Sequence, residues 1–176
     1  MADSIEPRII RNKAAVAGLY FGGISIAYVL ISSGMEKLSL GVAGSILSFI
    51  LWAAKFVGCI LLMRFLMQKL VREWDGVTRK ETFRFGMLTA LFSATLFAAF
   101  TLVFYLYIQP EMFSSVIGAL ASSGVYTSDQ MDMIARMEPW LPHIGCAGNF
   151  IWCCLYGIIL SAILSRNIPA DDPFAE

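Results

Sequence analysis

The stretch LWAAKFVGCILLMRF, residues 51–65, decides the fold class because it is apolar enough to cross a bilayer. It nevertheless carries Lys55 in its middle and Arg64 near its end. A charged side chain at the centre of a membrane-spanning helix costs roughly 2.5–3.5 kcal/mol on insertion-based scales. Two linked questions follow: whether the chain spans a membrane, and what the Lys55 ammonium contacts there.

The composition of the whole chain is typical of a membrane protein. Of its 176 residues, 58% are hydrophobic and 15% are charged, whereas average soluble domains contain about 45–50% apolar and 25% charged residues. The formal net charge is zero, which gives no sign of the strongly basic domain typical of nucleic-acid-binding proteins. We therefore expect membrane lipid around the chain and no nucleic acid.

Four apolar runs reach the length of about 20 residues that a bilayer crossing requires. They cover residues 14–33, 45–66, 85–108 and 141–164. Each run must be helical, because lipid offers no hydrogen bonds to an exposed backbone. The first run is longer than the apolar part of a secretory signal, and no A-x-A-like cleavage site follows it, so we interpret it as a retained span. The sequence predicts an all-α membrane protein: one transmembrane domain over residues 1–176, with four transmembrane helices in an antiparallel bundle.

Basic residues set the expected orientation, because they are kept on the cytoplasmic side of a membrane. They gather in the N-terminal segment, in the connection 67–84 and beside the last span: Arg8, Arg11, Lys13, Lys69, Arg72, Arg79, Lys80, Arg84 and Arg166. The first connection holds only Lys37, and the third, residues 109–140, holds only Arg136. Both termini and the connection 67–84 are therefore expected in the cytoplasm, and the loop 109–140 outside.

Capping signals predict where several helices begin. Thr78 is followed three residues later by Glu81, which predicts a capping box at the start of the third long helix. Thr127 and Gln130 form the same pattern within the loop 109–140. We expect one or two short interfacial helices in this loop, lying on the membrane or capping the bundle.

Small residues recur at helical spacing on two of the predicted spans. Gly18 and Gly22 form a G-x-x-x-G pattern on the first span, and Ala90, Ala94 and Ala98 form a stripe on the third. Such patterns let helix backbones approach closely in lipid. They predict either contacts within the bundle or a face for another copy or another subunit.

Lys55 lies about ten residues into the second span, which places it near the membrane midplane at a rise of about 1.5 Å per residue. No Asp or Glu occurs in any of the four runs. The polar side chains at comparable depth are Ser25, Tyr28, Thr101 and Asn149. Three roles for Lys55 are open: a structural hydrogen-bond donor within this polar cluster, a group that lines a wet cavity for an anion or protons, or a partner for an acidic residue of another protein.

The remaining chemical groups form no recognisable site. The chain has four cysteines: Cys59, Cys146, Cys153 and Cys154. They form no C-x-x-C pair, and none lies in the loop 109–140, so we interpret them as small buried hydrophobes and exclude a thiol oxidase. His143 and Cys146 form H-x-x-C, whereas a structural zinc site takes four ligands. We expect no metal, no other cofactor and no enzymatic activity.

The stretch GVTRKETFRFGMLTALFSATLFAAFTLVFYLYIQPEMF, residues 76–113, resembles domain-of-unknown-function family 4199, a family of small four-pass bacterial membrane proteins. The likeness rests on the helix start TFRFG at residues 82–86, on the long apolar helix, and on the helix end IQPE at residues 108–111. The long outer loop, the last span and the short polar tail complete the layout. The resemblance implies the inner membrane of a Gram-negative bacterium, and it transfers no functional residue.

Two functional hypotheses follow. The first is a non-enzymatic accessory or scaffolding subunit that packs against another integral membrane protein or further copies of itself. The alternative is a small oligomeric transporter or channel in which Lys55 lines an aqueous path.

Overall fold

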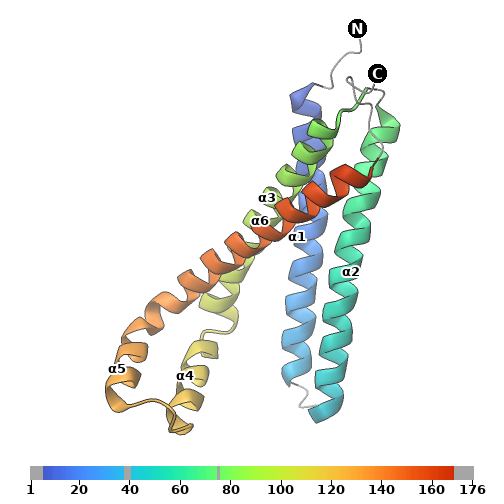
Figure 1. Ribbon diagram of the computed structural model, residues 1–176. Helices are drawn as coiled ribbons and strands as arrows, with labels where there is room; N and C mark the ends of the chain where they lie inside the picture. Colours follow the sequence, from blue (N-terminus) through green and yellow to red (C-terminus); the bar gives the residue numbers. More distant parts are fainter. Residues whose placement is uncertain (1–5, 38–40, 75, 169–176) are drawn as a thin grey trace.

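The computed structural model describes residues 6–37, 41–74 and 76–168, and this part of the chain is helical with no strand (Figure 1). The predicted ends of the domain, residues 1–5 and 169–176, and the side chain of Lys37 lie outside the described residues. The long helices are α1 (Pro7–Lys37), α2 (Gly41–Glu73), α3 (Arg79–Val103) and α6 (Leu141–Asn167). The shorter elements are the π-helical turn η1 (Phe104–Ile108), α4 (Met112–Ser122), α5 (Ser128–Met137) and the 3₁₀ turn η2 (Glu138–Trp140).

Four helical segments are long and apolar enough to cross a membrane. The predicted runs 14–33, 45–66, 85–108 and 141–164 lie within α1, α2, the continuous α3–η1 segment and α6. The predicted all-α class with four potential membrane spans is therefore confirmed. The helices are longer than the apolar runs, because α1 begins and α2 ends in segments that carry charged residues.

Both predicted capping boxes are present. The backbone N–H of Thr78 donates to the Glu81 carboxylate at 2.9 Å, and the backbone N–H of Glu81 donates to Thr78 Oγ1 at 3.4 Å. At the start of α5, the backbone N–H of Thr127 donates to Gln130 Oε1 at 3.0 Å. These bonds satisfy backbone donors that a helix start leaves free. The local sequence thus specifies where α3 and α5 begin.

Helix α3 is the central helix and packs against both α1 and α6. A Cβ atom added to Gly18 of α1 would lie 2.5 Å from Phe92 Cβ of α3, and one added to Gly22 would lie 2.6 Å from Leu96 Cδ2. On the other side of α3, a Cβ atom at Gly157 of α6 would clash with Ala90. The helix pairs α1–α3 and α3–α6 therefore approach to a distance that only small residues allow.

The predicted packing residues lie at these contacts within one chain. Gly18 and Gly22 are buried against α3, and Ala90, Ala94 and Ala98 are buried on α3 itself, with exposed fractions of 9%, 0% and 6%. The small-residue patterns thus lie at contacts between helices of one chain, which is the first of the two interpretations.

Helix α2 is joined to the others mainly near one end. The buried hydrophobic cluster there contains Ile10, Ala14, Ala17, Phe21, Met63, Met67, Leu70, Val77, Phe85, Leu164 and Ile168. An ion pair between Lys13 of α1 and Glu73 of α2 lies at the same end. Away from it, α3 and α6 lean away from α2 (Figure 1). The four long helices therefore do not close evenly around one axis.

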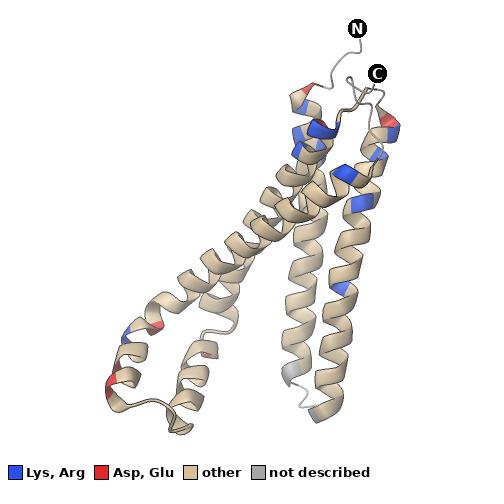
Figure 2. Cartoon of the chain, in the orientation of Figure 1, with Lys and Arg blue, Asp and Glu red and all other residues tan. Residues whose placement is uncertain are grey.

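The charged residues separate toward opposite ends of the molecule (Figure 2). Lysines and arginines gather where α1 and α3 begin and where α2 and α6 end, while α4 and α5 lie at the opposite end with acidic residues on α5. The rings of Tyr105 in η1 and Phe113 in α4 lie 5.1 Å apart and hold α4 against the end of the third span. The two short helices predicted in the loop 109–140 are present.

Replacing Gly157 by alanine should destabilise the fold by about 1–3 kcal/mol, because the added methyl group overpacks the α3–α6 contact. Gly148→Ala is the matched control, since Gly148 lies on the same helix and an added Cβ there meets no atom within 4 Å. Equilibrium unfolding in mixed micelles measures both effects. Equal stability of the two variants would contradict the close α3–α6 packing.

Candidate functional site

All four long helices line a cavity of about 280 Å³ in the middle of the molecule. Lys55 of α2 lies in its wall, together with Ser25 of α1, Ser93 of α3 and Tyr156 of α6. Phe21 and Met63 also line it and belong to the buried cluster that joins the four helices. The cavity is therefore closed toward the end of the molecule that carries the basic residues.

The Lys55 ammonium is held by two aromatic rings. Its Nζ atom lies 4.5 Å from the ring centre of Tyr28 on α1 and 5.4 Å from that of Phe97 on α3. Each such contact is worth about 0.5–1 kcal/mol when exposed and about 2 when desolvated. The ion pairs found among the described residues join Glu73 to Lys13 and Lys69 and do not include Lys55. Lys55 thus has ring faces around it but no carboxylate among the residues that the structure describes.

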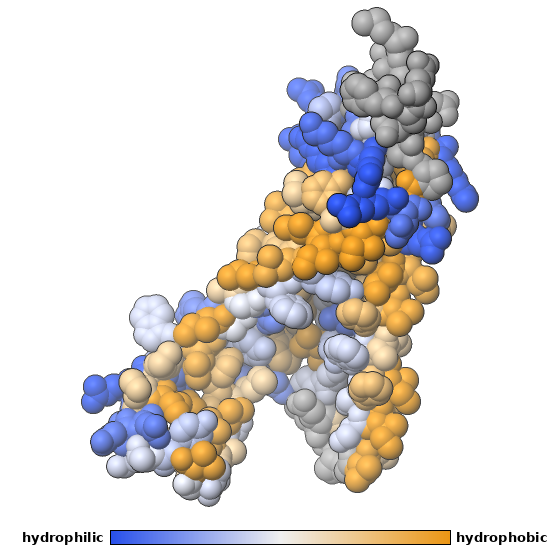
Figure 3. Space-filling view, viewed as in Figure 1, coloured by the Kyte–Doolittle hydropathy of each residue, from blue (hydrophilic) through white to orange (hydrophobic). Residues whose placement is uncertain are grey.

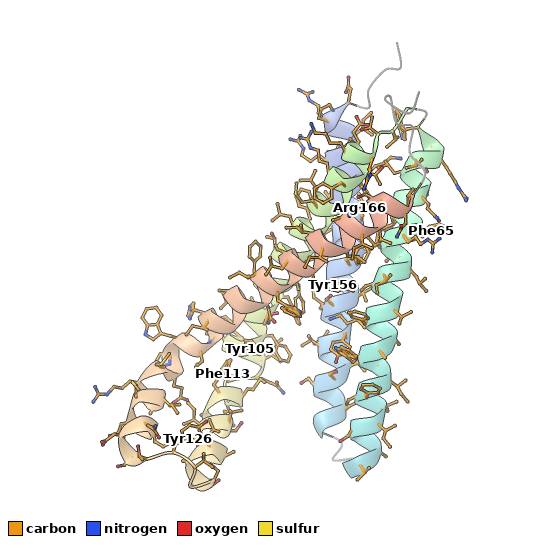
Figure 4. The ribbon with its side chains drawn as sticks, in the orientation of Figure 1. Phe65, Tyr105, Phe113, Tyr126, Tyr156 and Arg166 are labelled. Atoms are coloured by element: carbon orange, nitrogen blue, oxygen red, sulfur yellow. The ribbon has the colours of Figure 1, made fainter. Side chains whose placement is uncertain are left out.

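Tyr156 adds a second polar group without a partner. It projects from α6 toward α2 (Figure 4), where its ring lies 5.4 Å from that of Phe56. Its hydroxyl oxygen is buried and makes no hydrogen bond within the described part of the chain. An unpaired buried hydroxyl is costly, commonly by about 1–3 kcal/mol. Lys55 and Tyr156 thus both line the cavity, and neither polar group has a hydrogen-bond acceptor within the described part of the chain.

The structure brings together only part of the predicted polar cluster. Tyr28 contacts Lys55 through its ring, and Ser25 lines the same cavity. Thr101 is only 4% exposed, but its hydroxyl donates to the Phe97 carbonyl of its own helix at 2.8 Å. Asn149 is half-buried on α6 and does not line the cavity.

Several cavity residues are missing from the predicted cluster. Three of them are Cys59, Cys153 and Tyr156, and Phe97, which contacts Lys55 without lining the cavity, is also missing from that cluster. All four are apolar or weakly polar side chains in apolar runs, so composition gives no reason to select them. One local signal exists for Cys59, which follows Lys55 by four residues and so shares its helix face. Cys153 and Tyr156 come from α6 and depend on tertiary packing.

The cavity opens sideways between α2 and α6. Trp52 on α2 and Trp152 on α6 both line it, and they are 50% and 71% exposed. Figure 3 shows the molecule hollowed between its two lower arms. On α2, the rings of Phe49, Trp52 and Phe56 stack in sequence, with centroids 5.9 and 5.6 Å apart. Aromatic side chains thus flank the opening.

The family described as "Protein of unknown function (DUF4199)" matches residues 17–166. The chain belongs to this family. No curated protein and no solved structure matches it. This DUF4199 protein is an integral membrane protein with four helices long and apolar enough to span a bilayer.

The H-x-x-C pair of the DUF4199 protein does not converge on one site. The Cys146 thiol donates to the Ala98 carbonyl at 3.3 Å and thus faces α3. His143 is exposed, with its ring 6.2 Å from that of Trp140. Within residues 6–37, 41–74 and 76–168, no group of three or more His, Cys, Asp or Glu side chains could hold a metal ion.

A double-mutant cycle between Lys55 and Tyr28 tests the geometry of the site. Tyr28→Leu should cost about 0.5–2 kcal/mol more in the wild-type chain than in the Lys55→Met variant, because only the wild type loses the ring contact with an ammonium. Unfolding in mixed micelles gives the four stabilities. Tyr20→Leu is the control, since Tyr20 is 62% exposed on the same helix. Equal costs of Tyr28→Leu in both backgrounds would mean that the two groups do not interact.

Proposed function

We propose that this DUF4199 protein is a non-enzymatic accessory or scaffolding subunit of a larger assembly in a bacterial inner membrane. The observation that carries the proposal is the cavity that opens sideways between α2 and α6 and contains Lys55. Acyl chains have no acceptor to offer the Lys55 ammonium. A neighbouring protein can cover this opening and supply one, which lipid cannot do.

The uneven packing supports the same proposal. Helix α2 exposes large apolar side chains along most of its length, among them Phe49, Val57, Leu61 and Phe65 with exposed fractions of 66%, 52%, 59% and 60%. In a membrane this surface contacts either lipid or another protein. A partner helix that covers the cavity would lie beside α2 and would use the part of this surface next to Trp52.

The distribution of charge supports an orientation with both termini in the cytoplasm. The basic end of the molecule contains the start of α1, the end of α2, the start of α3 and the end of α6 (Figure 2). Basic segments next to spans are retained in the cytoplasm. The opposite end, with α4 and α5, is then outside.

Cysteine labelling tests this orientation. We expect Ser123→Cys, between α4 and α5, to react with a membrane-impermeant maleimide in intact spheroplasts. Arg79→Cys, at the start of α3, should react only after permeabilisation. The unmodified chain gives the background, because its four cysteines are half-buried within the helices. Reaction of both variants from the same side would contradict the proposed orientation.

The alternative function, a small oligomeric transporter or channel, requires Lys55 to face a continuous aqueous path. The cavity is closed toward the basic end by Phe21, Met63 and the rest of the buried cluster. Among the described residues, a single copy in this conformation therefore gives Lys55 no aqueous route to the basic end, and we favour the subunit.

Native isolation tests the subunit proposal. A tagged chain, extracted from its own membrane in a mild detergent, should migrate well above the 19.4 kDa single chain. It should also carry a second polypeptide in fixed stoichiometry, identified by mass spectrometry. The control is the same tagged chain expressed in a host that lacks the native partner. Migration of the native sample as a lone chain, or ion flux through liposomes that contain the purified chain alone, would overturn the proposal.

A further inference from the structure

We propose that the cavity receives the carboxylate of an Asp or Glu side chain from a transmembrane helix of the partner. This inference rests on the proposed function, because it names the group by which a partner would be recognised. Four steps lead to it: the unpaired donors, the depth of Lys55, the positions of the chain's own acids, and the size of the cavity.

The donors in the cavity call for an acidic acceptor. The Lys55 ammonium has three N–H donors, and within the described part of the chain it lies over the rings of Tyr28 and Phe97 without a hydrogen-bond acceptor. An ionised carboxylate has two oxygens with about four acceptor positions. One Asp or Glu side chain can therefore accept hydrogen bonds from Lys55 and neutralise the ammonium.

The depth of Lys55 excludes the head groups of lipids as the source of this acceptor. Lys55 lies near the middle of the predicted span 45–66, about 15 Å from either end at the helical rise per residue. Phospholipid phosphates lie beyond the edges of a hydrocarbon core about 30 Å thick. A carboxylate at the midplane is supplied instead by a side chain on a helix that crosses the membrane.

A second copy of this chain cannot supply the acid at that depth. The acidic residues of the described segments lie at helix ends or in the loop between spans: Glu6, Glu36, Glu73, Glu81, Glu111, Asp129, Asp132 and Glu138. None of the four apolar runs contains Asp or Glu. The partner at this site is therefore a different polypeptide.

The size of the cavity matches an inserted side chain. Its volume of about 280 Å³ leaves room for one inserted side chain and lies below the range of about 300–1,000 Å³ that is usual for drug-sized ligands. A whole helix, about 10 Å across, does not fit inside it. The exposed rings of Trp52 and Trp152 stand on the two sides of the opening. We infer that the partner helix lies across the opening, against these two rings, and points its acid inward.

Synthetic transmembrane peptides test the chemistry without the native partner. Three peptides share one Leu/Ala-rich sequence and carry Glu, Gln or Leu at the central position. Each carries a quencher that accepts energy from tryptophan, and each is reconstituted with the purified chain in lipid vesicles. We expect the Glu peptide to associate roughly fivefold to thirtyfold more strongly than the Leu peptide, with Gln between them.

Matched variants assign the effect to Lys55. Lys55→Met should remove the preference for Glu, whereas Arg64→Met should keep it, because Arg64 is an exposed cation on the same helix away from the cavity. Lys55→Glu should reverse the preference toward a fourth peptide with a central Lys. This reversal can be measured even if another variant folds poorly.

The outcomes separate this inference from the proposed function. Equal association of the Glu and Leu peptides with the wild-type chain, or an unchanged Glu preference in Lys55→Met, would overturn the carboxylate proposal. Native isolation would still detect a partner that binds elsewhere. Conversely, a Glu preference that depends on Lys55 would support the site even if the chain were isolated from its own membrane without a partner.

Discussion

The close approach of α3 to α1 and α6 is the constraint on which the rest of the structure depends. Lipid provides no hydrophobic force between helices, so van der Waals packing must hold them together. Gly18 against Phe92 and Gly157 against Ala90 bring the backbones near enough for this packing. The result is a three-helix core with α3 at its centre, and α2 packs on the outside of this core.

The position of α2 creates the candidate site. Its C-terminal half joins the buried cluster through Met63, Met67 and Leu70, and Lys13 holds its end by the ion pair with Glu73. Beyond this anchor, α3 and α6 lean away from α2 (Figure 1). Lys55 lies in the wall of the cavity at this position. The buried cluster around Met63 therefore closes the basic end of the molecule. The cavity begins where this cluster ends, on the side of Met63 that faces Lys55.

The sequence predicts what depends on length and local bonding. Apolar length defines the four spans, and the Thr78–Glu81 pair defines the start of α3 because its hydrogen bonds join residues three apart. Counting residues along each span also estimates the depth of a side chain. This estimate places Tyr28 and Ser25 at the depth of Lys55, and the structure brings both near it. Depth does not specify the helix face, and for this reason Thr101 and Asn149 were expected in the cluster but do not join it. Phe97 and Tyr156 reach Lys55 and its cavity only through the packing of α3 and α6.

The energetics of Lys55 differ from those of an ion pair in a soluble protein. In water, two charges lose their hydration when they are buried together, and this penalty often equals the attraction. In a membrane span, Lys55 has already lost most of its hydration during insertion, at a cost of roughly 2.5–3.5 kcal/mol. The two ring contacts offset part of that cost. A carboxylate on another helix has also lost its hydration on insertion, before the two helices associate. Pairing the two groups therefore adds electrostatic attraction without a further dehydration cost. An unpaired lysine at this depth therefore favours association with an acidic helix over association with a purely apolar one.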